Sequence, residues 1–261
     1  MLNKRTVRPF FIAFAALVVA VAGALALVRT RLTAQNAPNA ATQAAEKART
    51  PPGMVYVPGG AFLQGSADPE EADGGDSLPR RRAFVPSFYL DRTEVTNREF
   101  ARFRPGHDYP AGEGELPVTN VTYDDAAAYA RWAGKRLPTE AEWEKAARGT
   151  DGRLYPWGNT WEPERVAKRA PRPSGKVEPL RWSKDPNQCL VGGYSRVRRV
   201  GSVPSGVSPY GCLDMAGNAW EWVQGFYNNN PEMRLLRGGA VGYGERACRS
   251  DIRAVEGSGA T

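Results

Sequence analysis

Two acidic side chains, Asp214 and Glu221, lie seven positions apart in the segment DMAGNAWEW, with a glycine between them. Carboxylate oxygens are hard donors of the kind that calcium prefers, and a bend at a glycine can add main-chain carbonyl oxygens to the same site. The spacing therefore suits a calcium site. The alternative interpretation is a metal-free turn that places Trp220 and Trp222 in the core.

Thiols form the second group of reactive side chains, and the chain has three of them, Cys189, Cys212 and Cys248. One disulfide with a leftover thiol and three buried thiols are both compatible with this count, and the sequence does not choose between them. Cys212 is followed by Leu213, so a position in the core is the simplest interpretation for it.

The chain has one histidine, His107. Metal sites that need several imidazoles, such as His-rich zinc sites and two-histidine iron sites, are therefore excluded. A Ser-His-Asp triad would have to use His107, which lies in the loop-like stretch RPGHDYPAG.

Acidic pairs occur at Asp124-Asp125 and at Glu140/Glu142, and paired carboxylates can act as a general acid and base. Each pair, however, follows a threonine at the predicted start of a helix, where a carboxylate caps free N–H groups. We therefore interpret them as capping groups. The same pattern occurs at Thr96 and Glu99.

The elements that must position these groups are short. Residues 54–65 (MVYV, PGG, AFLQG) predict a hairpin, and residues 87–91 predict a half-buried strand. Three capping boxes predict short helices, the last two ending at Gly134 and Gly149. With 28 glycines and 21 prolines among 261 residues, much of the backbone should be turns. The predicted fold class is α+β, with little regular secondary structure.

The formal net charge of +7 is unevenly distributed. Residues 1–50 carry +6 and residues 165–199 carry +8, which leaves −7 for the rest of the chain. Residues 165–199 have no helical periodicity, so a solvated basic insertion is the simpler interpretation and an anion-binding surface the alternative. A mildly acidic body does not predict binding to nucleic acid.

The N-terminal region divides into three parts. Residues 1–8 are a basic flank, residues 9–28 are uncharged and long enough to cross a bilayer, and residues 29–52 suit a flexible linker. Residues 9–28 predict a transmembrane anchor, with a cleaved signal peptide as the alternative. The folded body, residues 53–261, would then lie outside the cytoplasm, at the periplasmic or cell-surface side.

Taken in order, the motifs resemble the formylglycine-generating enzyme family, the sulfatase-modifying-factor domain. The resemblance spans about residues 53–253 and rests on MVYVPGGAFLQGS, FYLDRTEVTNREF, KRLPTEAEWEKAARG, YPWGN, DMAGNAWEW and RLLRGGAV. It implies a single compact, glycine-rich domain related to C-type lectins. It also implies that calcium is bound by the side chains of Asp214 and Glu221 and by the carbonyls of Gly217 and Ala219. The family's other calcium site has no counterpart in the segment ERVAKRAP.

Active members of that family oxidise a cysteine of a client sulfatase to formylglycine with two thiols and a copper ion. Counting from Gly239, the positions of the two thiols hold Tyr243 and Cys248, so one thiol is absent. The resemblance therefore favours a binding or scaffolding module for a protein or peptide client. The alternatives are a copper-dependent oxidase that uses Cys248, and a relative with another reaction. A sulfoxide synthase is disfavoured, because His107 alone cannot bind its iron.

Overall fold

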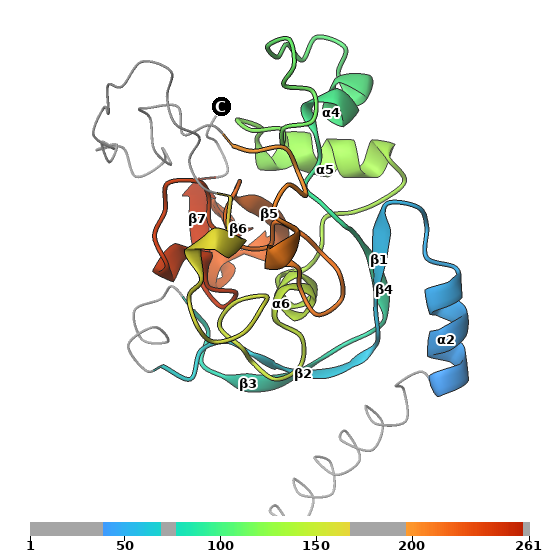
Figure 1. Cartoon of the computed structure of the whole chain (residues 1–261), viewed down its shortest axis with the longest axis vertical. Helices are drawn as coiled ribbons and strands as arrows, with labels where there is room; N and C mark the ends of the chain where they lie inside the picture. The colour runs from blue at the N-terminus through green and yellow to red at the C-terminus, as the bar shows by residue number, and fades with distance from the viewer. Residues whose placement is uncertain (1–38, 69–76, 168–196, 258–261) are drawn as a thin grey trace, which may run out of the picture.

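A computed structural model of the chain describes residues 39–68, 77–167 and 197–257. Figure 1 shows short strands and helices wrapped around a central helix, α6, and joined by long irregular segments. The α+β class and the low content of regular structure are as predicted.

The helices are α2 (Ala40–Ala48), α4 (Asn97–Phe103), α5 (Tyr123–Trp132) and α6 (Glu140–Arg148), with single 3-10 turns η1 (Pro163–Arg165), η2 (Pro204–Gly206), η3 (Tyr227–Asn229) and η4 (Arg246–Cys248). The strands are β1 (Met54–Val57), β2 (Gly60–Gln64), β3 (Arg81–Val85), β4 (Phe88–Asp91), β5 (Glu221–Phe226), β6 (Met233–Arg237) and β7 (Ala254–Gly257).

The predicted hairpin between β1 and β2 is wrong. β1 pairs with β4, and β2 pairs with β3, both antiparallel, with Val57 opposite Phe88 and Gly60 opposite Val85. Residues 54–64 and 81–91 thus form one long ribbon that bends at Pro58 and Pro86. A proline cannot donate a ladder hydrogen bond, so the two-residue interruption on each chain becomes a corner instead of a reversal. The predicted strand at residues 87–91 is confirmed as β4.

All three predicted capping boxes are present. The side chains of Thr96, Thr122 and Thr139 each accept a hydrogen bond from the N–H three residues on, and the acidic side chain there accepts one from the threonine N–H. The capping interpretation of Asp125 and Glu142 is therefore confirmed.

Helix α6 supplies the centre of the core. Trp143, Ala146 and Ala147 are fully buried and contact strands of two sheets through Val57, Val223 and Leu235. The opposite side of α6 is charged and equally buried. Its charges are paired there, because Glu144 forms ion pairs with Arg148 of the same helix and with Arg237 of β6. A short helix with both faces buried must satisfy its charges inside the protein.

The third sheet carries the C-terminal part of the chain, with strand order β5-β6-β7. Its register shifts between Val223 and Phe226, which is a bulge in β5. The bulge is fixed from outside the sheet, because the N–H of Gln224 donates to the carbonyl of Pro138 at 2.7 Å.

The N-terminal region differs from the expected linker over residues 40–48, which form α2. Glu46 attaches this helix to the ribbon: its carboxylate accepts a hydrogen bond from the hydroxyl of Tyr56, and its carbonyl accepts one from the hydroxyl of Tyr89, both at 2.7 Å. Within the described residues, no helix has the length and apolarity needed to cross a bilayer. The predicted span at residues 9–28 and most of the basic insertion at 165–199 lie outside the described residues.

Candidate functional site

The segment from Asp214 to Glu221 forms a tight, well-packed loop that leads into β5. Asp214, Gly217 and Asn218 all have positive φ angles, of 60°, 84° and 68°. The N–H of Gly217 donates to the carbonyl of Gly238 at 2.7 Å, which ties the loop to the glycine pair that follows β6. Three left-handed residues within five positions make the backbone turn sharply, and this turn directs the side chains at both ends of the loop inward.

Glu221 is held by the core helix. The indole N–H of Trp143 donates to Glu221 Oε2 at 3.0 Å. A methyl group on Gly238 would lie 3.7 Å from Glu221 Oε1 and 3.9 Å from the carbonyl oxygen of Ala219, so these two oxygens face the same glycine. Two of the four predicted ligands, Glu221 and Ala219, thus border the same glycine.

The other two predicted ligands lie on the same loop. Asp214 is buried, and its carboxylate accepts a hydrogen bond from the N–H of Gly201. Gly217 packs at the turn, where a methyl group in its place would lie 3.4 Å from Val166 Cβ and 3.9 Å from Cys248 Sγ.

Glu94 is a third acidic residue at this loop, and the sequence analysis missed it. Its carboxylate accepts hydrogen bonds from the N–H of Ala219 at 2.9 Å and from the side-chain amide of Asn218. Glu94 therefore connects the segment before α4 to the loop across more than 120 residues of sequence. Its motif, TEVTN, suggested only a helix start at Thr96. We refer to Glu94, Asp214 and Glu221 as the carboxylate cluster.

The carboxylate cluster is electrostatically costly. Loss of hydration, and then the charges of Glu221 and Asp214, raise the pKa of Glu94 well above its ordinary value. Loss of hydration, helped by the charge of Asp214, raises the pKa of Glu221 to about 8, although the bond from Trp143 opposes this shift. Loss of hydration also raises the pKa of Asp214. Repelling carboxylates of this kind are stabilised by a proton or a cation.

The donor chemistry of the cluster fits a hard cation. Among the described residues, no group of three or more His, Cys, Asp or Glu side chains is placed to bind a metal ion by side chains alone. A metal site here would therefore need main-chain oxygens, and the Ala219 carbonyl lies beside Glu221. Carboxylate and carbonyl oxygens together are the ligand set of calcium.

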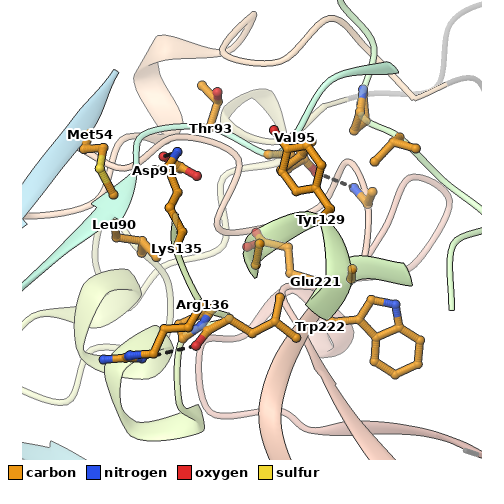
Figure 2. Close-up of a pocket in the computed structure, with 18 of the residues that line it drawn as sticks. Met54, Leu90, Asp91, Thr93, Val95, Tyr129, Lys135, Arg136, Glu221 and Trp222 are labelled. Carbon is orange, nitrogen blue, oxygen red and sulfur yellow. Dashed lines mark hydrogen bonds and ion pairs between the residues drawn. The ribbon is translucent and has the colours of Figure 1, made fainter. Parts of the chain in front are cut away.

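A pocket of about 490 Å³ opens next to the cluster, and both Glu94 and Glu221 line it. Figure 2 shows Glu221 in the middle of this pocket, with Tyr129 and Lys135 around it. The walls are mainly apolar. At the rim, Lys135 pairs with Asp91 at 2.6 Å and Arg136 pairs with Glu142 at 2.6 Å. A pocket of this size, apolar with few polar groups, suits a small ligand or a side chain of a partner.

The two positions that the resemblance assigns to the oxidase thiols hold Tyr243 and Cys248. Cys248 is 2% exposed, and burial raises the pKa of its thiol to about 12. Tyr243 packs edge-on against Trp220, with ring centroids 5.5 Å apart. Cys212 is equally buried, and burial raises the pKa of its thiol to about 12 as well. Both thiols are therefore protonated at neutral pH in the metal-free protein. Cys189 lies outside the described residues.

The remaining reactive residues have structural partners. His107 Nε2 lies 3.1 Å from the side-chain oxygen of Asn97, and its ring packs against Phe100. Asp125 pairs with Arg104, and Glu140 with Arg253. These contacts give His107, Asp125 and Glu140 structural roles.

The fold and the site together define a class of protein. It is a small α+β domain in which a sharply turned acidic loop is hydrogen-bonded to a glycine pair. The chain belongs to the formylglycine-generating enzyme family: residues 39–260 match the sulfatase-modifying factor enzyme 1-like domain. This confirms the resemblance, and the match begins earlier than residue 53 because it includes α2.

The relatives include proteins named as formylglycine-generating enzymes and proteins named as inactive forms. The chain is 32% identical to inactive C-alpha-formylglycine-generating enzyme 2 of Mus musculus, covering 72% of this chain and 73% of that one. It is 33% identical to the formylglycine-generating enzyme of Thermomonospora curvata, covering 67% of this chain and 72% of that one. Among solved structures, PvdO from Pseudomonas aeruginosa has the same fold, with a TM-score of 0.59 and 24% identity over 79% of this chain and 88% of that one.

Proposed function

We propose that this protein is a calcium-stabilised binding or scaffolding module of the family and does not oxidise a client cysteine. The main support for the proposal comes from the residues at the two positions where active members of the family have thiols. Tyr243 occupies the first, and Cys248, at the second, is buried with its pKa raised to about 12.

The chemistry of copper supports this proposal. Copper(I) is a soft ion that selects thiolate ligands, and the oxidase uses two of them. Tyr243 offers a hard oxygen, and its ring is packed against Trp220. Cys248 would have to lose a proton in a buried position, where its sulfur packs against Gly239 and Gly217. The names of the relatives do not decide the question, because active and inactive proteins match equally well.

Calcium is proposed as the cation of the loop, bound by the side chains of Asp214 and Glu221 and the carbonyls of Gly217 and Ala219. The repulsion within the carboxylate cluster supports the proposal, as does the Ala219 oxygen beside Glu221. Bound calcium would neutralise the cluster and brace the loop. Glu94, which already holds the N–H of Ala219, would keep that segment in register.

The apolar pocket beside Glu221 supports a binding role, with a protein or peptide client such as a sulfatase as the partner. We further propose that residues 9–28 anchor the chain in a membrane and that the domain lies outside the cytoplasm. The uncharged length of that segment and its basic flank support this arrangement.

A direct assay tests the proposal. The full chain is incubated with copper, oxygen and a peptide that carries the sulfatase cysteine motif, and mass spectrometry measures conversion of cysteine to aldehyde. We expect no conversion above that of the Cys248→Ser variant. Conversion that wild type supports and Cys248→Ser does not would overturn the proposal in favour of the oxidase. The Thermomonospora curvata enzyme serves as the positive control.

A further inference from the structure

A second feature, outside the carboxylate cluster, is the arginine at the start of β6. The guanidinium carbon of Arg234 lies 3.9 Å from the ring centroid of Tyr123 and 4.2 Å from that of Phe226. The two rings come from different elements, the first turn of α5 and the end of β5. The guanidinium is therefore held between two aromatic faces, which fixes its plane.

The fold builds this arrangement through the bulge in β5. The register shift between Val223 and Phe226 leaves Gln224 and Gly225 out of the ladder and brings Phe226 opposite Arg234. The hydrogen bond from Gln224 to Pro138 fixes the bulge. Bulges commonly redirect a side chain towards a site. Here the bulge places an apolar ring, 40% exposed to solvent, over a charged group.

No acceptor satisfies this guanidinium within the described part of the chain. Arg234 Nε is buried and has no hydrogen-bond partner. Glu256 stands directly opposite Arg234 in the register of β6 and β7, yet these two described residues form no ion pair. A buried donor without a partner lowers the stability of the folded state. The folded protein is therefore less stable than it would be if Arg234 formed an ion pair with Glu256.

We infer that Arg234 is a binding site for the carboxylate of a partner polypeptide. Nε is buried and two rings lie against the guanidinium, so the edge formed by Nη1 and Nη2 is the part left for a ligand. Two parallel N–H groups at that edge match the two oxygens of a carboxylate. The exposed ring of Phe226 provides an apolar surface for the residue next to the carboxylate, which suits a polypeptide better than a free acid.

Charge selects the carboxylate over a phosphate. One guanidinium balances one negative charge, and Glu256 on the neighbouring strand would repel a dianion more strongly than a monoanion. This inference goes beyond the proposed function. It depends on neither calcium nor the thiol positions, so its failure and that of the proposed function are separate results.

Nuclear magnetic resonance of the full chain, labelled with ¹⁵N at arginine, tests the inference. The probes are acetyl-Gly-Glu-Gly-amide and the same peptide with glutamine or phosphoserine at its centre. We expect the glutamate probe to shift the Arg234 Nη signals saturably and the glutamine probe to leave them unchanged. A stronger response to the phosphoserine probe would overturn the carboxylate assignment, and equal responses to all three would overturn the site.

Matched variants separate this site from general charge effects. Arg234→Gln and Arg131→Gln remove the same charge, but Arg131 is an exposed arginine of α5. We expect Arg234→Gln to weaken binding of the glutamate probe by roughly tenfold or more, since a charged hydrogen-bonded pair is lost. Arg131→Gln should bind like wild type. Phe226→Leu keeps apolar area without the ring and should bind more weakly than wild type. Equal binding by Arg234→Gln and wild type would contradict the inference.

Discussion

The indole N–H of Trp143 donates to the carboxylate of Glu221 at 3.0 Å, across 78 residues of sequence. This bond links the centre of the core to the acidic loop, because Trp143 is fully buried in α6 and Glu221 begins β5. The orientation of Glu221 is therefore set by the packing of α6. This bond restricts where the carboxylate oxygens of Glu221 can lie.

Gly238 is the position where this link is most sensitive to added volume. Its φ is 99°, and a methyl group there would lie 3.3 Å from the Trp143 ring and 3.7 Å from Glu221 Oε1. We expect Gly238→Ala to lower the free energy of unfolding by about 1–2 kcal/mol, the cost of a left-handed alanine, and to weaken calcium binding. Urea denaturation with and without calcium measures both effects. Gly244→Ala, where a methyl group meets nothing within 4 Å, is the control.

Glu144 is the carboxylate that pairs with two buried arginines of the core, Arg148 and Arg237. Its carboxylate accepts from Arg148 at 2.9 Å, from Arg237 at 2.8 Å and from the N–H of Gly65 at 2.7 Å. Glu144→Gln removes the negative charge while both arginines stay buried, so we expect a loss of about 3–5 kcal/mol of unfolding free energy.

The matched control for Glu144 is Asp151→Asn, because Asp151 forms a surface pair with Arg153. Its loss should cost less than about 1 kcal/mol in the same denaturation experiment. Similar losses for the two variants would show that the buried pairs contribute no more than the exposed one.

Lys145 makes stability depend on pH in the alkaline range. It donates to the carbonyls of Pro58 and Gly60, at the corner of the ribbon, and burial lowers its pKa from 10.5 to about 8. Between these two values the unfolded chain holds a proton that the folded protein has released. The contribution of Lys145 to stability therefore rises as pH increases from about 8 to about 10.5.

Lys145→Met removes this proton linkage. We expect the unfolding free energy of the variant to rise less with pH than that of wild type between pH 8 and about 10, measured by urea denaturation, because the opposing effect of the buried thiols is the same in both proteins. Lys135→Met, at an exposed ion pair with Asp91, should keep the wild-type slope. Parallel pH profiles for wild type and Lys145→Met would refute the assignment.

Sequence patterns predicted the structure correctly where the interacting groups are a few residues apart in the chain. The capping boxes at Thr96, Thr122 and Thr139 involve groups three residues apart, so their pattern alone predicts the helix starts. The partners of β1 and β2 were not predictable in the same way. The Pro-Gly-Gly segment suggests a reversal, and only pairing with residues 81–91 turns it into a corner.

The candidate site was predicted only in part for the same reason. Asp214 and Glu221 share one motif, so a short loop keeps them close enough for the charge of Asp214 to raise the pKa of Glu221. Glu94 reaches that loop from a segment whose sequence suggests only a helix start, and no local pattern connects it to Ala219. The burial of Cys248 also depends on distant packing, against Gly217 and Gly239.

The central claim, that calcium stabilises the carboxylate cluster, is tested most directly by the melting temperature of the full chain during a calcium titration. We expect the wild-type Tm to rise with calcium, because a ligand at about 100 times its Kd adds about 2.7 kcal/mol to the folded state. Asp214→Asn should lose most of this rise, and Asp151→Asn should keep it. A wild-type Tm that does not respond to calcium, or an equal response in Asp214→Asn, would contradict the claim.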